Sequence, residues 1–488
     1  MANKSEAAVH PQWMYRKQGN SSKILHFRIV DRKRMLILSD VLVIVLATFS
    51  GLLIWSYFAF GIFSLQFVEN RWHWFFYLPI LWLALSSMND YYELRTAAHI
   101  RLSAKSLSWS VFELLLVYQS LYFFIPEKLL PRLFILVFLA LAAFGSGVSR
   151  LARIGTANYT DTRRKVIIVG SGPAAASIWK ALREEAAKDY EVVGCVMSSE
   201  DPLSLPMYAD ILGFGAELPE LARKHSASEL IMAYINEIPT DIFHGLIQCY
   251  QQGIIIAPMP NLYEDVTGRV PVDHVGENLW SLILPLDTHS IQIKFNLFIK
   301  RIFDIILSVI GLVLFAPIFP IIALAVKIDS AGPVLFFQKR TGRGSKPFTV
   351  IKFRTMVDNA ERKSGPLWAS TDDPRVTRLG RFLRKSRIDE IPQLLNVLRG
   401  DMSIVGPRPE RPEFVEILSG EIPFYEARHV VKPGLTGWAQ IRYRYGSSID
   451  DSMMKLQYDL YYIRHQSLLL DLLIMAKTIK IMLTFQGQ

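Results

Sequence analysis

Cysteine is scarce in this chain, which has only Cys195 and Cys249 among its 488 residues. Two cysteines cannot build a disulfide framework or a cysteine-rich zinc site, so most of the protein is expected to face a reducing compartment. Disorder and a collagen-like fold are excluded by composition, because 51% of the residues are hydrophobic and only 20% are charged. At this length the chain is expected to form roughly two to four folding units.

Net charge is also missing from the larger part of the chain. Residues 1–298 hold 26 Lys and Arg against 26 Asp and Glu, whereas residues 299–488 hold 28 against 18. The whole net charge of +10 (28 − 18) therefore belongs to the last 190 residues. A basic excess can indicate nucleic-acid binding. Here it is confined to the part of the chain that holds a fifth apolar run and the Asp389-Glu390 pair, which favours other phosphate groups and an anionic membrane surface, and we expect no nucleic-acid partner.

Long apolar runs are abundant at the start of the chain. Four of them follow one another, each near the ~20 residues that a helix needs to cross a bilayer: Leu36–Phe63, His73–Met88, Trp109–Ile125 and Leu133–Val148. The sequence predicts a cytoplasmic N-terminal segment over residues 1–35 and four spanning helices over residues 36–150. Basic residues gather before the first run, between the second and third, and after the fourth, which places both ends of this bundle in the cytoplasm.

Residues 160–290 alternate β-branched runs with helical segments, which predicts a Rossmann-like α/β domain. Its glycine-rich turn, with Gly170 and Gly172, can bring a phosphate close to a helix N-terminus, and Glu200 or Asp201 is the candidate ribose ligand. A lone glycine motif is weak evidence for a bound nucleotide, so a regulatory or structural role is favoured. The predicted elements are strand Lys165–Gly170, helix Ala176–Ala187 and strands Glu191–Met197, Glu229–Ala233 and Gly253–Ala257.

A Tyr-x-x-x-Lys pair is absent from residues 160–290. A short-chain dehydrogenase or nucleotide-sugar dehydratase uses such a pair for proton transfer, so catalysis is not expected in this domain. Two alternative functions nevertheless stay open at this point. One is a nucleotide-sugar dehydratase or dehydrogenase that acts through the Rossmann-like domain, and the other is a nucleotide-sensing membrane scaffold.

A fifth apolar run, Ile302–Val326, is interrupted by Ala316-Pro317 and by Pro320. Basic residues flank the run on both sides, so both of its ends are expected in the cytoplasm. Proline breaks a helix, and the ~15 residues before the break give only ~22 Å of helix. We therefore predict a re-entrant helix over residues 302–327 that breaks at Ala316 and Pro317 and returns to the same face of the membrane.

The final third contains one adjacent Asp-Glu pair, Asp389 and Glu390, on an apparent helix close to basic clusters. Arginine suits bidentate binding of phosphate. A carboxylate among cations stays ionised and can act as a nucleophile or as a metal ligand. The clusters are Gln338–Arg343, Lys352–Met356 and Arg375–Arg387, and the segment Gly400–Pro409, with Arg408, follows the pair.

Residues 295–488 resemble the catalytic domain of the bacterial sugar transferases, the monotopic phosphoglycosyl transferases. The matching motifs occur in order, as Lys300-Arg-Ile-Phe-Asp-Ile, Lys352-Phe-Arg-Thr-Met, Asp389-Glu-Ile-Pro-Gln-Leu-Leu-Asn-Val-Leu-Arg-Gly-Asp-Met402, Val405-Gly-Pro-Arg-Pro and Lys432-Pro-Gly-Leu-Thr-Gly-Trp-Ala-Gln440. Four helices, a Rossmann-like domain and this mostly α-helical domain together resemble the large members, such as undecaprenyl-phosphate glucose or galactose phosphotransferases.

The resemblance implies a two-step reaction. Asp389 would attack the β-phosphorus of a UDP-sugar, release UMP and form an aspartyl–phosphosugar intermediate, from which undecaprenyl phosphate takes the phosphosugar. Glu390 would hold Mg²⁺. Arg408 is the first candidate for phosphate binding, with Arg354, Lys352 and Arg387 as further candidates. Family members often have Ser-Pro at the helix break, where this chain has Ala316-Pro317.

The same resemblance implies the partners and the location. The expected partners are a UDP-sugar, with glucose or galactose favoured, undecaprenyl phosphate and membrane lipid, and a homodimer is possible. The expected location is the bacterial inner membrane, with several spans and with the catalytic domain on the cytoplasmic face. The product would initiate exopolysaccharide, capsule or O-antigen assembly.

The last apolar segment of the chain is predicted to lie in the membrane interface. It comprises residues 467–485, and its residues Lys477 and Lys480 are expected to point toward the lipid headgroups.

Overall fold

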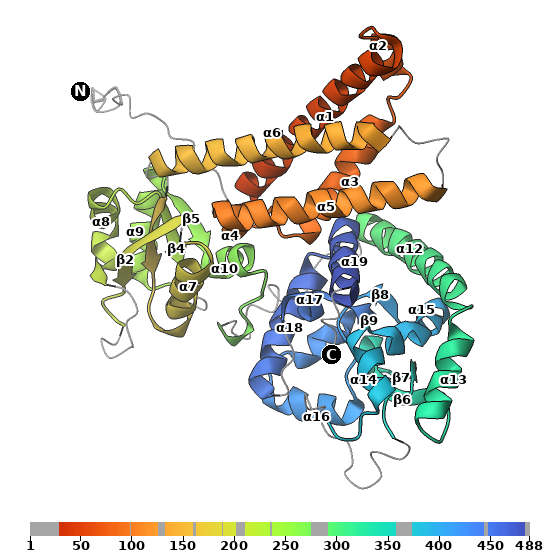
Figure 1. Cartoon of the computed structure of the whole chain (residues 1–488). Coiled ribbons are helices and arrows are strands. Elements are labelled where there is room, and N and C mark those ends of the chain that lie inside the picture. The colour runs from red at the N-terminus through yellow and green to blue at the C-terminus, as the bar shows by residue number, and fades with distance from the viewer. Residues whose placement is uncertain are drawn as a thin grey trace, which may run out of the picture.

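The computed structural model describes residues 29–97, 99–124, 132–159, 163–187, 189–201, 210–234, 237–274, 291–357, 373–443 and 448–483. Three units follow one another along the chain, a helical bundle, an α/β unit and a mostly helical C-terminal unit (Figure 1). Most of the predicted N-terminal segment, residues 1–28, lies outside the described residues.

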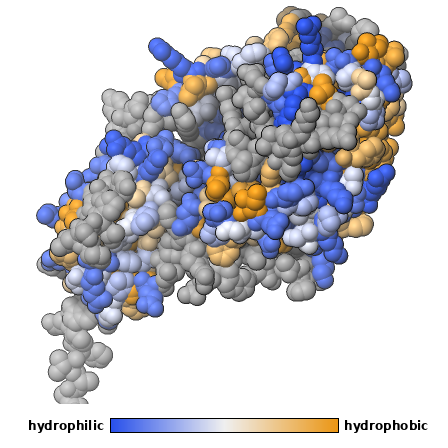
Figure 2. Space-filling model, turned by 90° about the horizontal axis from the view of Figure 1, so that it is seen from below, coloured by the Kyte–Doolittle hydropathy of each residue, from blue (hydrophilic) through white to orange (hydrophobic). Residues whose placement is uncertain are grey.

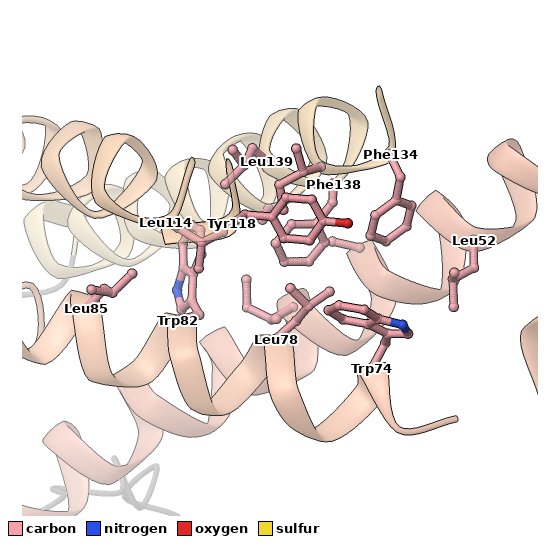
Figure 3. Close-up of a cluster of buried hydrophobic side chains, with 14 of the residues drawn as sticks. Leu52, Trp74, Leu78, Trp82, Leu85, Leu114, Tyr118, Phe134, Phe138 and Leu139 are labelled. Carbon is pink, nitrogen blue, oxygen red and sulfur yellow. The ribbon is translucent and has the colours of Figure 1, made fainter. Parts of the chain in front are cut away.

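The N-terminal bundle has helices at all four predicted apolar runs. They are α1 (Ile29–Phe60), α3 (Trp74–Met88), α5 (Ile100–Phe124) and α6 (Arg132–Tyr159), with short helices α2 (Leu65–Glu69) and α4 (Leu94–Ala97) between them. One face of α3 carries Trp74, Leu78, Trp82 and Leu85 at helical spacing, and Figure 3 shows these side chains facing Leu114, Tyr118, Phe134 and Phe138 of α5 and α6. This apolar contact holds the bundle together.

Two helices of the described residues are long and apolar enough to cross a membrane, Arg34–Phe60 and Phe134–Arg153. Helix α3 is apolar but has only 15 residues, or ~22 Å of helix, which is short of the ~30 Å hydrocarbon core. Helix α5 is long enough, but Arg101, Lys105 and Glu113 make it more polar than a typical span. Length and composition therefore support two of the four predicted spans.

The α/β unit is a five-stranded parallel sheet in the order β3-β2-β1-β4-β5. Its strands are β1 (Arg164–Val169), β2 (Tyr190–Met197), β3 (Ile211–Phe214), β4 (Glu229–Met232) and β5 (Ile255–Pro258), and its helices are α7 (Gly172–Glu185), α8 (Leu218–Lys224), α9 (Thr240–Gln251) and α10 (Met259–Thr267). Side chains of a strand point alternately to the two faces, so Val166 and Ile168 pack against α7 and α10, whereas Ile167 and Val169 pack against α8 and α9. The predicted parallel strands are present, with β3 as one that the sequence reasoning missed.

The C-terminal unit is mostly helical, as predicted, with two small two-stranded sheets. Its elements are α12 (Ile291–Phe315), α13 (Phe319–Asp329), β6 (Leu335–Thr341), β7 (Pro347–Phe353), α14 (Arg378–Lys385), α15 (Leu394–Arg399), β8 (Ser403–Val405), α16 (Pro412–Glu421), β9 (Gly434–Thr436), α17 (Trp438–Arg442), α18 (Ile449–Arg464) and α19 (Leu468–Leu483), with 3₁₀ turns η7 (Ile388–Gln393) and η8 (Tyr425–Val430). Val270 and Val272, which the sequence assigned to the α/β domain, are buried in the core of this unit.

Helices α12 and α13 form a bent pair, with 65° between them at a break of three residues. The break contains Ala316 and Pro317, as predicted, and the first arm starts at Ile291, earlier than the predicted residue 302. Both arms expose apolar side chains, such as Val313 (66%) and Ile321 (68%). Figure 2 shows apolar surface along the edge where Figure 1 places this pair, while much of the remaining visible face is hydrophilic.

Helix α19 corrects the prediction of a helix with its lysines toward the headgroups. Lys477 is 8% exposed and forms an ion pair with Asp90, and Lys480 donates a hydrogen bond to Asn89. Both partners lie in the segment that follows α3. The helix therefore docks on the N-terminal bundle, and its lysines bind protein groups.

Candidate active site

The predicted carboxylate pair lies in the 3₁₀ turn η7, between α14 and α15. The sequence reasoning expected a helix, but Pro392 has no N–H to donate within the turn, and a regular α-helix begins only at Leu394. Asp389 and Glu390 are both 7% exposed. Adjacent residues of a 3₁₀ turn are about 120° apart, so the two carboxylates point in different directions and can have different roles.

Two cations converge on one oxygen of Glu390. The Nζ of Lys352 in β7 lies 3.0 Å from Oε1, and Nη2 of Arg408 lies 2.8 Å from the same atom. Burial alone would raise the pKa of Glu390, but the charges of Arg408 and Lys352 outweigh it and hold this pKa well below its usual range. Glu390 is therefore a permanent anion that orders both cations.

Asp389 has a different environment. Burial, followed by repulsion from the Glu390 charge, raises the pKa of Asp389 above its usual value, while Lys352, Arg384 and Arg408 act in the opposite direction. Within the described residues, no side chain donates a hydrogen bond to this carboxylate. Burial destabilises the ionised form of this carboxylate, and none of the described side chains stabilises it with a hydrogen bond. A carboxylate in this state is suited to nucleophilic attack.

Arg408 is placed by the β8–β9 pair and by two prolines. Gly406 N donates to Thr436 O at 2.9 Å, and Gly434 N donates to Pro407 O at 2.8 Å. A Cβ on Gly437 would lie 2.3 Å from Gly406 O, so the two segments approach as closely as only glycine allows. The backbone before Arg408 is therefore fixed by the strand pair, which aims the side chain at Glu390.

A buried ion pair behind Arg408 was missed by the sequence reasoning. Arg428 donates to the carbonyl oxygen of Arg408 at 3.1 Å and to Asp459 Oδ2 at 2.7 Å, and it also donates to the hydroxyl of Tyr425. Arg428 and Asp459 are 6% and 1% exposed. They are 31 residues apart, and the only sequence signal was a lone Asp among the inward-facing residues of α18.

Two other predicted phosphate ligands have different positions. Arg387 precedes the carboxylate pair with φ at 54°, a left-handed conformation that costs a non-glycine residue about 1 kcal/mol or more. The positive charge of Arg387 also lowers the pKa of Glu390. Arg354 is turned toward the end of α13, where Nη2 donates to Ser330 O at 2.6 Å and to Ser330 Oγ at 3.0 Å. The described contacts thus give Arg354 a helix-capping role.

At the break of the bent pair, Ala316 N donates to Leu312 O at 2.8 Å and Ile318 N donates to Phe315 O at 2.9 Å. Backbone groups therefore hold the turn around Pro317, and no side-chain hydroxyl at position 316 is needed for these bonds. Val326, with Phe315, belongs to the small apolar core below the break.

The glycine-rich turn of the α/β unit lies at the start of α7, with Gly170 and Gly172 at φ values of 134° and 80°. Asp201 Oδ2 lies directly beside it and accepts hydrogen bonds from Ser171 Oγ at 3.0 Å and from the hydroxyl of Tyr234. The carboxylate proposed as a ribose ligand is thus already bound by its own domain. A negative charge held here disfavours a phosphate at the same place.

The described residues contain no group of three or more His, Cys, Asp or Glu side chains that could enclose a metal ion. Mg²⁺ is commonly bound by one or two carboxylates together with substrate phosphates, so a dedicated protein cage is not required. Asp389 and Glu390 fit such a site, because both are carboxylates in a setting of cations that would bind phosphate. Glu390 offers Oε2 for this purpose, since the described contacts of Lys352 and Arg408 are to Oε1.

Comparison with known proteins gives the family. Residues 295–485 match the family described as bacterial sugar transferase, and residues 87–237 match one described as CoA-binding domain. The UDP-glucose:undecaprenyl-phosphate glucose-1-phosphate transferase of Klebsiella pneumoniae is 31% identical over 452 residues, 90% of this chain and 93% of that protein. The chain belongs to the bacterial sugar transferase family.

Other relatives of this bacterial sugar transferase have related names. The protein of the same name from Escherichia coli is 34% identical over 70% of this chain and 74% of its own length. The UDP-N-acetylgalactosamine-undecaprenyl-phosphate N-acetylgalactosaminephosphotransferase of Aeromonas hydrophila is 44% identical over half of this chain, and the match spans 55% of that protein. The relatives thus differ in the sugar that their names give.

Proposed function

We propose that this chain transfers a sugar 1-phosphate from a UDP-sugar to undecaprenyl phosphate and releases UMP. The observation that carries the proposal is the buried Asp389–Glu390 pair, in which Glu390 orders two cations while Asp389 is left without a hydrogen-bond donor among the described residues. The names of the relatives support the donor and the acceptor. The alternative dehydratase function has no comparable group of residues in the described part of the α/β unit.

In the first step an oxygen of the Asp389 carboxylate attacks the β-phosphorus of the UDP-sugar. The new bond joins Asp389 to the phosphosugar, and the bond to the bridging oxygen breaks, so that UMP leaves with the electron pair. In the second step a phosphate oxygen of undecaprenyl phosphate attacks the same phosphorus. This attack releases Asp389 and gives undecaprenyl-diphospho-sugar, so atoms and charges balance over the two steps.

The basic residues act on the phosphates in both steps. Arg408 and Lys352 are held by Glu390 at 2.8 and 3.0 Å, so their positive charges face the region where the diphosphate must lie. Such charges stabilise the transferred phosphoryl group and need little reorganisation during the reaction. Arg387 and Arg384 add positive charge around the pair. Mg²⁺, held by Glu390 with Asp389 nearby, would neutralise the diphosphate and the departing UMP.

The test of the reaction is UMP release by the purified full chain, with undecaprenyl phosphate in detergent or vesicles and Mg²⁺. We expect UMP with at least one UDP-sugar from a panel of glucose, galactose, N-acetylglucosamine and N-acetylgalactosamine, and loss of the activity in excess EDTA with recovery on adding Mg²⁺. UDP-glucose and UDP-galactose are the favoured donors. Absence of UMP with every donor would refute the proposed reaction, and unchanged activity in EDTA would refute the metal requirement.

We propose further that the bent pair is a re-entrant helix. Both arms are attached to the C-terminal unit, the first through Arg301, whose guanidinium donates to Val397 O and Leu398 O at 2.6 and 2.9 Å, and the second through Arg354 and Ser330. Two arms that begin and end on one unit enter and leave the same face of the membrane. Four bundle helices then complete the topology, with the segment after α3 on the cytoplasmic side because it contacts this unit.

The geometry of the bent pair fits a shallow insertion. If the two arms are equally inclined, each meets the membrane plane at about 32°, half of the 65° bend. The apolar part of α12, Ile302–Phe315, has 14 residues and is therefore ~21 Å long and descends ~11 Å. This depth is less than the ~15 Å of one hydrocarbon leaflet. The pair is thus long enough to anchor in one leaflet without crossing to the other.

Labelling of single cysteines tests this topology. We expect Lys294→Cys and Lys327→Cys, both exposed and on opposite arms, to react with a membrane-impermeant maleimide only in inverted vesicles. The matched control is Glu69→Cys at the opposite end of the bundle, which should react only from the outside. Labelling of Lys327→Cys from the outside would show that the pair crosses the membrane.

For the α/β unit we propose a structural role. The support is Asp201, which binds Ser171 at the glycine-rich turn, together with Val270 and Val272, which are buried in the C-terminal unit. Further contacts between the two units are the hydrogen bond from Trp438 Nε1 to Gly268 O at 3.1 Å and the pair of Glu264 with Arg464 and His465. The unit therefore fixes the C-terminal unit from the side opposite to the bent pair.

A further inference from the structure

The segment Asn89–Glu93, between α3 and α5 of the bundle, is the place where the bundle contacts the C-terminal unit through charged groups. Lys477 forms an ion pair with Asp90, Lys480 donates to Asn89, and Arg442 Nη2 lies 2.7 Å from Glu93 Oε1. Figure 1 shows α19, the helix of Lys477 and Lys480, directly beneath α3 and α5. Basic groups of the C-terminal unit thus meet acidic and amide groups of one short segment.

This segment is a rigid platform within the bundle. Asn89 Nδ2 donates to Ser110 Oγ at 3.2 Å and to Glu113 Oε2 at 2.7 Å, and Ser106 Oγ donates to Asn89 O at 2.6 Å. Arg150 of α6 donates to Tyr91 O at 3.1 Å and lies over the Tyr91 ring at 4.2 Å. Glu113, an ionisable residue within a predicted span, therefore orders this segment.

The backbone also presents Asp90 outward. Asp90 has φ at 56°, and Tyr91 N donates to Ser86 O at 3.0 Å, so the segment closes the C-terminus of α3 with a left-handed residue. Asp and Asn tolerate this conformation better than most residues. The Asp90 side chain remains 49% exposed, while the side chain of Lys477, which binds it, is 10% exposed.

We propose that the segment Asn89–Glu93 is a docking platform that sets the tilt and height of the C-terminal unit above the bilayer. The proposal rests on the proposed transferase function. The bent pair α12–α13 anchors the unit to the membrane at one place, and a body attached at one place can still rock. The α/β unit packs against the opposite side of the C-terminal unit, and the platform adds an attachment directly to the bundle through α19 and α17. Asp90 and Glu93 are therefore positioning residues for the acceptor, whose phosphate must be met at headgroup depth.

The second half-reaction is the one that depends on this geometry. A UDP-sugar arrives from the aqueous phase and can reach Asp389 whatever the tilt of the unit, whereas the lipid acceptor is confined to the membrane. Loosening the platform should therefore raise the KM for undecaprenyl phosphate and leave the first half-reaction, UMP release without acceptor, unchanged. A purely structural role would lower both half-reactions together.

The test uses the full chain in vesicles of anionic phospholipid and the double variant Asp90→Asn with Glu93→Gln. These changes remove both platform charges, keep the side-chain sizes, and leave the C-terminal unit unaltered. We expect the KM for undecaprenyl phosphate to rise at least fivefold, with an unchanged UMP burst when no acceptor is present. With a short-chain isoprenyl phosphate that dissolves in water, the variant and the wild type should have the same KM for the acceptor.

Two further variants complete the design. Glu69→Gln removes one negative charge from an exposed residue at the far end of the bundle, and it should leave the acceptor KM and the UMP burst unchanged. Exchanging the partners, as Glu93→Arg with Arg442→Glu, should recover most of the acceptor KM lost in Arg442→Glu alone. An unchanged KM in the double variant, or an equal fall in burst and steady state, would overturn the docking proposal. Absence of UMP from the wild type would instead overturn the transferase function.

Discussion

Asp389→Asn should abolish turnover and at the same time make the protein more stable. Loss of the nucleophile removes the aspartyl–phosphosugar intermediate, and we expect UMP release to fall by a factor of about 10³ or more. Stability should rise because burial and the Glu390 charge raise the pKa of Asp389 to about 6. A residue that is needed for folding would have the opposite effect on stability.

The sign of this stability change follows from proton linkage. The pKa of Asp389 is higher in the folded protein than in the unfolded chain, so the folded state binds more protons between the two values and stability falls as pH rises through them. Above about pH 6 the ionised Asp389 costs the fold up to ~3 kcal/mol, since each tenfold change in proton affinity corresponds to ~1.4 kcal/mol. Asn carries no charge, so the variant avoids this cost.

The measurement is thermal unfolding in detergent at pH 7.5 with EDTA, alongside UMP release with Mg²⁺. We expect the Tm of Asp389→Asn to exceed that of the wild type by several degrees, and the difference to shrink as the pH falls below about 6 and to vanish only below the unfolded-state pKa of 3.8. Asp401→Asn is the matched control, because Asp401 is an exposed carboxylate on the same unit and should change neither quantity. Full turnover in Asp389→Asn would reject the nucleophile, and a lowered Tm would reject the strained carboxylate.

Much of the fold could be predicted because it depends on local patterns. Long apolar runs gave the helices of the bundle, and continuous β-branched runs gave four of the five strands. The strand β3 was missed, since its four residues, Ile211–Phe214, include a glycine and lie at the edge of the sheet, where few apolar neighbours are required. The break at Ala316-Pro317 was predictable because proline has no N–H to donate and clashes with the preceding helical turn, although α3 accommodates Pro79 within one helix.

The candidate site was predictable to the extent that its residues belong to short sequence motifs. Asp389, Glu390 and Arg408 came from short motifs, and the structure brings Lys352 to them from β7. Arg354 belongs to the same motif as Lys352 but points to Ser330, where it caps the end of α13. No single-sequence pattern could indicate that the pKa of Glu390 is lowered while that of Asp389 is raised, since both effects arise from tertiary contacts.

The contacts of the two lysines of α19 could not be predicted from local sequence patterns either. An apolar helix with two lysines has the composition of an interfacial helix, and nothing within it reveals that Asn89 and Asp90 lie opposite. The partners are almost 400 residues earlier in the chain, so the pairing depends on how two units assemble. Long-range charge pairs of this kind, including Arg428 with Asp459, are the part of the architecture that local patterns could not predict.

Asp459→Asn should be the most destabilising conservative substitution near the site. It leaves the buried guanidinium of Arg428 without its carboxylate, and breaking a buried ion pair by removing one partner costs about 3–5 kcal/mol. Burial raises the pKa of Asp459 to about 6, so removal of its charge offsets part of this cost. Activity should fall as well, because Arg428 also fixes the carbonyl of Arg408, whose side chain binds Glu390. We expect a loss of stability in urea unfolding and a fall in kcat/KM of about tenfold, equivalent to ~1.4 kcal/mol.

The double variant Arg428→Met with Asp459→Leu separates the two effects. Replacing a buried ion pair by apolar side chains of similar volume is often neutral for stability, so the double variant should recover most of the stability that Asp459→Asn loses. It has no donor for the Arg408 carbonyl, however, and its kcat/KM should stay low although the protein is folded. The reason is that an imprecisely placed Arg408 stabilises the transferred phosphoryl group less well. If activity returned together with stability, Arg428 would be a folding residue only, and the backbone of Arg408 would be fixed sufficiently by Pro407, Pro409 and the β8–β9 pair.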